Sequence, residues 1–164
     1  MVTASSLLGA AGEHHVMCQL LRHGFIAALA PAGVPNCDIV VTDAVGARLC
    51  AVQVKTRRNL GSDGGWHMSE KHEHLAATTL FYCFVDFGRA ASDAPSVHVV
   101  PATIVADVLR RSHMAWLDAP GARGQQRNDG PFRRFLPDYA KLGLPETAGW
   151  LDPYGAAWDL LRLA

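Results

Sequence analysis

The sequence predicts a mixed α/β fold in which helices flank one mixed β-sheet. Short segments rich in Val, Ile, Phe and Tyr, bounded by turn residues, predict strands. Longer segments with apolar residues at helical spacing predict helices around them. Of the 164 residues, 49% are hydrophobic, which is enough for the core of one domain.

The first element is a predicted helix over residues 5–23. A serine pair at its start can cap it, and Gly24 can end it. Val16 and Leu20 belong to an apolar stripe at helical spacing. Glu13 falls on the same stripe, where a carboxylate is costly unless something pairs with it.

Five segments predict strands. Short turn sequences join the first three of them, which indicates an antiparallel meander. The fourth is a nearly continuous apolar run, as expected for a central strand covered on both faces. The five segments are 25–30, 37–43, 48–56, 80–87 and 96–100.

Three further helices are predicted. Ser69 can cap a helix over 69–78, whose position before the fourth strand indicates a crossover. Pro101 opens a helix that runs to about residue 117, and a short helix covers 154–163. The resulting order, α-β-β-β-α-β, forms a core with its following helix over 1–117. The extension over 118–164 is expected to pack on that core, and its part up to 153 predicts no firm structure.

Composition narrows the possible partners and compartments. With 15 basic and 15 acidic residues the net charge is zero, so any site for an anion must be local. No apolar run is long enough to span a membrane, and the N-terminus does not resemble a signal peptide, so we expect a cytoplasmic protein. The four cysteines contain no CxxC pair, which indicates reduced thiols.

Four side chains from three elements predict a metal site. Asp38 opens the second strand, and Gln53 and Lys55 point to one side of the third, which should pair with it. Mg²⁺ prefers oxygen ligands, so Asp38, the Gln53 amide oxygen, the Val54 carbonyl and Glu13 are candidate ligands. The Lys55 amine would supply positive charge beside a phosphate and help to orient or deprotonate water.

This set resembles the PD-(D/E)xK nuclease superfamily, which has a restriction-endonuclease-like fold. The matching residues are Glu13 in GAAGEHHV, Asp38 in NCDIVV, and Gln53 with Lys55 in AVQVKT. Over roughly residues 5–100 the layout is similar to archaeal Holliday-junction resolvases and Mrr-type catalytic domains. The resemblance implies a Mg²⁺- or Mn²⁺-dependent endonuclease acting on DNA, with Glu13, Asp38, Gln53 and Lys55 as catalytic residues. Cutting two strands would favour a homodimer.

Two departures from the superfamily pattern keep other functions open. Cys37 stands where a proline is usual, and Gln53 replaces the usual Glu, which predicts weaker metal binding. The alternative is a catalytically inactive nucleic-acid-binding or accessory protein with the same fold. An unrelated small-molecule enzyme or a structural domain is a third interpretation. Each residue of the set also has an ordinary explanation alone, such as an exposed strand edge or a turn.

Basic residues outside the set are candidate contacts to nucleic acid. Arg57 and Arg58 continue the strand of Lys55 and could hold phosphates. The loop 121–135 carries Arg123, Arg127 and Arg133, and is either a flexible basic loop or a flap that contacts nucleic-acid backbone. The histidines complete no zinc set and are expected on the surface or in packing, although His72 or His74 could line the site.

Overall fold

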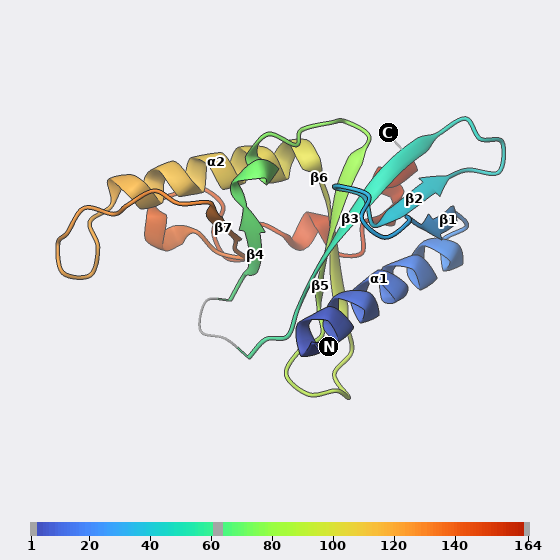
Figure 1. The fold of residues 1–164 in the computed structure, drawn as a ribbon, viewed down its shortest axis with the longest axis horizontal. Coiled ribbons are helices and arrows are strands. Elements are labelled where there is room, and N and C mark those ends of the chain that lie inside the picture. Colours follow the sequence, from blue (N-terminus) through green and yellow to red (C-terminus); the bar gives the residue numbers. More distant parts are fainter. Residues whose placement is uncertain (1–2, 61–63, 163–164) are drawn as a thin grey trace.

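The computed structural model describes residues 3–60 and 64–162, and its elements follow the predicted strands closely (Figure 1). The loop predicted around residues 61–63 and the end of the predicted C-terminal helix at Leu163 lie outside the described residues. Besides four short 3-10 helices, the elements are α1 (Ala4–Arg22), β1 (Ile26–Leu29), β2 (Ile39–Thr42), β3 (Leu49–Arg57), β4 (Trp66–Ser69), β5 (Leu80–Asp86), β6 (Ser96–Pro101), α2 (Ala102–Asp118) and β7 (Phe132–Phe135).

One mixed sheet of five strands, in the order β1-β2-β3-β5-β6, forms the centre of the molecule. The first three strands make the predicted antiparallel meander, with Ile39 opposite Val52. β3 and β5 are parallel, as the predicted crossover requires, and β6 returns antiparallel to β5. β5 lies between β3 and β6 in this order and is buried from Leu80 through Val85, because both of its faces are covered.

The two faces of the sheet bury separate apolar clusters. On one face α1 packs Val16 and Leu20 against Ile39, Val52 and their neighbours, as the sequence predicts. On the other face the apolar side of α2 packs against alternate residues of β5, together with β4 and β7. Because side chains alternate along a strand, β3 contributes Val52 and Val54 to the α1 face and turns Gln53 to the α2 face.

The connection between β3 and β5 corrects one prediction. Instead of a helix over 69–78, the chain forms β4 and then a single 3-10 helix, η1 (Glu70–Glu73). β4 pairs with β7, a strand of the segment for which no firm structure was predicted, and they form a second, two-stranded sheet. The side chain of His72 explains the short turn, since it is buried and its Nδ1 lies 2.8 Å from the Tyr82 hydroxyl on β5.

The C-terminal segment also differs in detail from its prediction. It forms 3-10 helices, η3 (Asp152–Tyr154) and η4 (Trp158–Arg162), in place of one short helix. Trp158 and Leu161 of η4 are buried in the cluster beneath α1. The segment thus packs on the core, while the division at residues 117 and 118 stays a prediction. Within the described residues, no helix is long and apolar enough to cross a membrane.

Candidate metal centre

The candidate site lies where β3 continues beyond the start of β2. β2 pairs with Leu49–Val52 only, so the rest of β3 extends past its neighbour on that side. Asp38, one residue before β2, lies at the point where β2 stops covering β3, and it bonds to β3 on both sides of that point. Its backbone N–H donates to the Val52 carbonyl at 2.9 Å, and its Oδ2 accepts from the Val54 N–H at 2.7 Å.

These two contacts fix the Asp38 carboxylate against β3. The N–H and C=O of one strand residue point to the same edge, so the Val54 carbonyl also points to the side of Asp38. This is the backbone oxygen that the sequence suggested as a ligand.

Glu13 reaches the same place from α1. The helix approaches β3 closely at Gly12, where an added Cβ would overlap Oγ1 of Thr56, so glycine is required for this approach. Glu13, the next residue, is half-buried. Its pKa is raised, first by burial and then by the negative charge of Asp38, as expected for two carboxylates that share one site.

Gln53 supplies a buried oxygen without a partner. Its side chain is 7% exposed, and its Oε1 forms no hydrogen bond within the described part of the chain. A buried amide oxygen in this state is costly unless a ligand or water satisfies it. The β3–β5 register sets Gln53 beside Tyr82, whose hydroxyl is already bound to His72.

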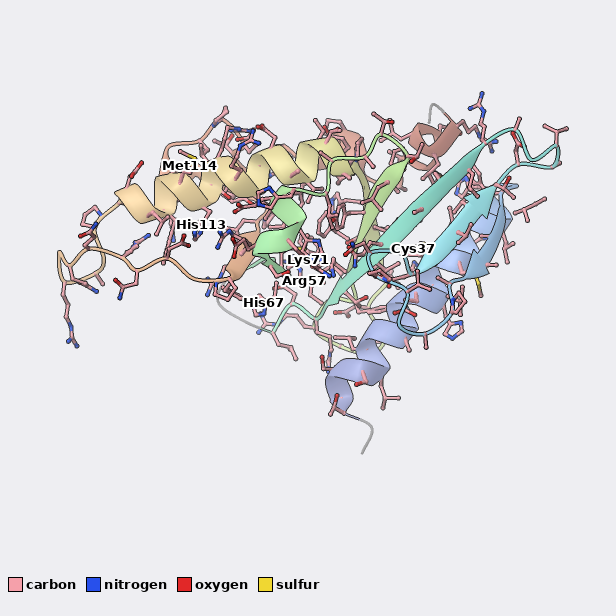
Figure 2. The ribbon with its side chains drawn as sticks, turned by 45° about the horizontal axis from the view of Figure 1, so that its top comes forward. Cys37, Arg57, His67, Lys71, His113 and Met114 are labelled. Carbon is pink, nitrogen blue, oxygen red and sulfur yellow. The ribbon has the colours of Figure 1, made fainter. Side chains whose placement is uncertain are left out.

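Lys55 and Lys71 bring positive charge to the site. Burial lowers the pKa of the Lys55 amine, Lys71 lowers it further, and the charge of Asp38 acts in the opposite direction. Lys71 is exposed on η1, on the α2 side of the sheet (Figure 2). Lys71 was not predicted as a site residue, because only the pairing of β4 with β7 and the short η1 turn bring it near β3, and the spacing of residues along the sequence gives no sign of this.

These residues fit a hard divalent cation. Two carboxylates, an unpartnered amide oxygen and a strand carbonyl are all oxygen donors, which Mg²⁺ and Mn²⁺ prefer. In the part of the chain that the structure describes, no group of three His, Cys, Asp or Glu side chains could hold a metal ion. The third side-chain donor of the candidate set, Gln53, is neutral. The donor set is therefore that of a weak site with low ligand charge.

The predicted arginine contacts divide into two groups. Arg57 is held by Asp86 at 2.7 Å and lies 4.0 Å from the Trp66 ring, and Arg133 is buried against Glu73. Both guanidinium groups therefore have structural partners. Arg58 donates to the Arg89 carbonyl, Arg127 lies over Trp116, and Arg123 is exposed, so these three remain near the surface.

His72 gives the site a measurable pH dependence. Burial and the charges of Lys55 and Lys71 lower its pKa from 6.5 to about 4. Between these values the unfolded chain binds a proton that the folded protein does not. The contribution to stability is therefore full above pH 6.5 and is lost as the pH falls to about 4, a change of roughly 3 kcal/mol.

We expect His72→Asn, which can keep a hydrogen bond to Tyr82, to remove most of this loss. Urea unfolding between pH 7 and pH 4 measures it, with His14→Asn on the exposed face of α1 as the control. If His72→Asn loses as much stability on acidification as the parent, the lowered pKa of His72 is wrong.

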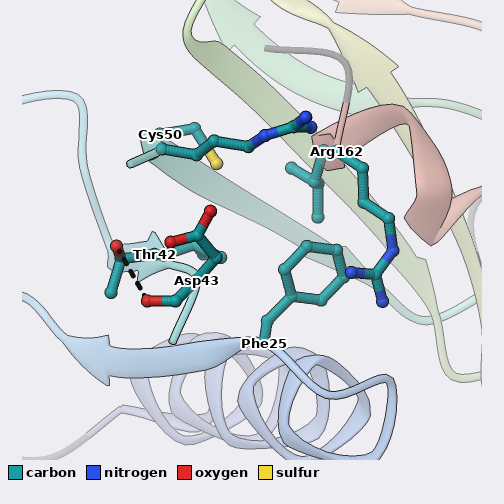
Figure 3. A pocket seen from close by; sticks show the side chains of 8 residues that line it. Phe25, Thr42, Asp43, Cys50 and Arg162 are labelled. Carbon is teal, nitrogen blue, oxygen red and sulfur yellow. Dashed lines mark hydrogen bonds between the residues drawn. The ribbon is translucent and has the colours of Figure 1, made fainter. Parts of the chain in front are cut away.

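A cavity of about 240 Å³ at the other end of β2 and β3 is separate from this site (Figure 3). Phe25, Cys50 and Arg162 line it, and the Arg162 guanidinium lies 4.4 Å from the Phe25 ring and donates to the His23 carbonyl. Burial raises the pKa of the Cys50 thiol to about 11, so it is not a thiolate nucleophile at neutral pH. The contacts of Arg162 instead fasten η4 to the end of α1.

Two solved protein structures are similar to this one. The bacterial homing endonuclease I-Ssp6803I is 14% identical and superposes with a TM-score of 0.56 over 99% of this chain and 94% of its own. Hjc, a Holliday junction resolvase from the archaeal hyperthermophile Archaeoglobus fulgidus, is 16% identical, with a TM-score of 0.45 over 78% of this chain and 83% of its own. No protein-family model and no curated protein matches the sequence. The likeness to the homing endonuclease covers nearly the whole of both chains, and it shows that this protein has the predicted restriction-endonuclease-like fold.

Proposed function

We propose that this protein is a metal-dependent nuclease that hydrolyses phosphodiester bonds in DNA. The observation that carries the proposal is the placement of Asp38 at the open edge of β3, where its charge acts on both Glu13 and the half-buried Lys55. Burial penalises the charges of Glu13 and Lys55, and Asp38 adds a second negative charge near Glu13. Binding a cation and a phosphate would compensate all three.

Each residue has a distinct role in this proposal. Asp38, Glu13, Gln53 Oε1 and the Val54 carbonyl would hold Mg²⁺ or Mn²⁺. When bound, such an ion offsets charge on the phosphate and makes water more acidic. The Lys55 amine would orient the attacking water and take part in its deprotonation; burial lowers the pKa of this amine, which favours its neutral form more than in an exposed lysine. Water adds to phosphorus, the P–O bond to the leaving strand breaks, and the leaving oxygen takes a proton.

Cleavage of DNA tests this function directly. We expect the parent to cut linear, branched or single-stranded DNA with Mg²⁺ or Mn²⁺ and to be inactive in EDTA. Asp38→Asn should lose activity, because it removes a negative charge from the cation ligands. If none of these substrates is cut with either cation, or if Asp38→Asn cuts as fast as the parent, the proposed activity is wrong.

Gln53 favours a second candidate, a protein that binds DNA without cutting it. A neutral amide replaces one acid, so the site attracts cations less strongly than a three-acid set would. This candidate predicts DNA binding that is unaffected by Mg²⁺ and by Asp38→Asn. DNA binding by the parent without cleavage under any cation would favour it over the nuclease.

A further inference from the structure

Lys71 lies beside the metal centre but has no role in the reaction proposed above. It is the second residue of η1, and its side chain is exposed. Among the ion pairs that the described residues form, none includes Lys71, whereas Arg57 and Arg133 on neighbouring strands are bound to Asp86 and Glu73. Exposed lysines are common, so the case for a role depends on where η1 holds this one.

One buried contact places η1 on the sheet face that carries Gln53 and Lys55. The β3–β5 register sets Gln53 opposite Tyr82, and Lys55, two residues further on, points to the same face as Gln53. The Tyr82 hydroxyl lies 2.8 Å from Nδ1 of His72, the residue after Lys71. Lys71 therefore lies on the α2 side of the metal centre, next to the side chains that β3 directs to that side.

The turn that carries Lys71 is also fixed on its other side. Glu73 is bound to the buried Arg133 of β7, and the Glu70 N–H donates to the Pro131 carbonyl at 2.9 Å. η1, drawn in green, also lies against α2 (Figure 1). The backbone of Lys71 is therefore held in place before any ligand binds, and a preorganised contact loses less conformational entropy on binding.

The acids of η1 leave the charge of Lys71 available. A 3-10 helix has three residues per turn, so side chains at i and i+3 lie on one side and adjacent side chains point about 120° apart. Glu70 and Glu73 are three residues apart, and Glu73 faces Arg133. Glu70 thus lies on the Arg133 side of the turn, and Lys71 presents its charge on another side.

The positive charges of Lys71 and Lys55 oppose each other. Burial is the first cause that lowers the pKa of the Lys55 amine and of His72, and the charge of Lys71 lowers both further. A fixed turn that holds two like charges near each other costs free energy, and a nearby anion would offset that cost. The backbone of DNA supplies such anions at regular intervals.

We propose that Lys71 binds a backbone phosphate of the DNA strand that occupies the metal centre, beside the phosphate at Lys55. This inference rests on the proposed function for the identity of the ligand. It gives the bound strand a path past η1, on the α2 side of the sheet. A contact between lysine and phosphate carries no base information, so Lys71 contributes to affinity equally for any base sequence.

The salt dependence of DNA binding tests this contact without relying on cleavage. The probe is a fluorescein-labelled duplex of about 20 base pairs, measured by anisotropy in EDTA at salt concentrations from about 50 to 200 mM. We expect Lys71→Gln to make the slope of log affinity against log salt shallower by about 0.9, the value for one lost phosphate contact. Over this range the parent should therefore lose about 3- to 4-fold more affinity than Lys71→Gln. Lys71→Arg keeps the charge and should keep the parent slope.

The matched control is Lys141→Gln, which removes the same charge from another exposed lysine on a 3-10 helix, η2 (Ala140–Leu142). It should bind DNA with the parent slope. The Lys71 and Lys141 variants should unfold at the same urea concentration as the parent, because each replaces an exposed side chain. A second duplex of unrelated base sequence should show the same change for Lys71→Gln.

Lys55→Ala separates a contact made by Lys71 itself from an effect that acts through Lys55. Two lysines that hold different phosphates should act additively, so the double variant should change the slope by about twice as much as either single variant. A double variant with the slope of Lys55→Ala alone would show that Lys71 holds no phosphate of its own.

Three further outcomes would overturn the proposal: no DNA binding by the parent, a parent slope in Lys71→Gln, or equal changes in Lys71→Gln and Lys141→Gln. The last would indicate a general effect of net charge. These results are independent of the nuclease assay. A parent that cuts no DNA, but whose slope changes with Lys71→Gln, refutes the proposed activity and keeps the contact. A parent that cuts DNA, with an unchanged slope in Lys71→Gln, keeps the activity and refutes the contact.

Discussion

Lys55→Ala is expected to lower the rate of DNA cleavage by about 10²- to 10⁴-fold, the usual contribution of a positioned proton-transfer group. Affinity for Mn²⁺ should stay near that of the parent, because an ammonium group is not a cation ligand. Removing the positive charge can even strengthen cation binding slightly, since Lys55 lies within reach of Asp38. Single-turnover cleavage and a Mn²⁺ titration, performed on the same preparation, separate the two effects.

The control for this variant is Arg22→Ala, which removes an exposed positive charge at the C-terminal end of α1, whereas Glu13 lies in the middle of that helix. It should cut DNA within about 2-fold of the parent rate at constant salt, because surface charges are screened. A Lys55→Ala protein that retains full activity would exclude the lysine from the reaction.

Arg133→Ala has the largest expected effect on stability, a loss of about 3–5 kcal/mol in the free energy of unfolding. Arg133 and Glu73 have side chains 4% and 11% exposed, so the variant leaves a nearly buried carboxylate without its partner. Arg133 also donates to the Gly130 carbonyl. The pair joins β7 to η1, so its loss should loosen the turn that carries Lys71 and His72.

Urea unfolding followed by circular dichroism measures this loss. Arg110→Ala is the matched control, because Arg110 pairs with Asp107 at 2.7 Å on the exposed side of α2, with both side chains largely accessible. An exposed pair of this kind contributes about 0.2–1 kcal/mol. Similar losses in the two variants would mean that the Arg133–Glu73 pair is not a buried structural contact, and Arg133 would return to the set of candidate DNA contacts.

The local pattern of apolar residues was sufficient to predict the strands of the main sheet, but it did not predict the second, two-stranded sheet. The strands of the main sheet carry alternating or continuous apolar residues, so their periodicity identifies them. β7 reads FRRF, and in isolation its two arginines resemble a basic loop. It is a strand because it pairs with β4, with Trp66 opposite Phe135, and this contact joins segments that are far apart in the sequence. The predicted helix over 69–78 failed for the same reason, since burial of His72 against Tyr82 outweighs helix propensity.

The candidate site shows the same division between local and long-range information. The faces of β2 and β3 follow from strand alternation, so the sequence could place Asp38, Gln53 and Lys55 on one side. It could not show that Asp38 is fixed by the Val54 N–H, because that contact depends on where β2 begins. Nor could it show that Arg57 is committed to Asp86 and Trp66, which come from two other strands.

Calorimetric titration with Mn²⁺ tests the metal centre most directly. The parent should bind one Mn²⁺ weakly, Gln53→Glu should bind it more tightly because it adds a negative charge to the donor set, and Asp38→Asn should bind it far more weakly. Lys55→Ala, measured alongside, should bind within a few-fold of the parent. Absence of binding by both the parent and Gln53→Glu, or equal binding by the parent and Asp38→Asn, would contradict a cation site at the open edge of β3.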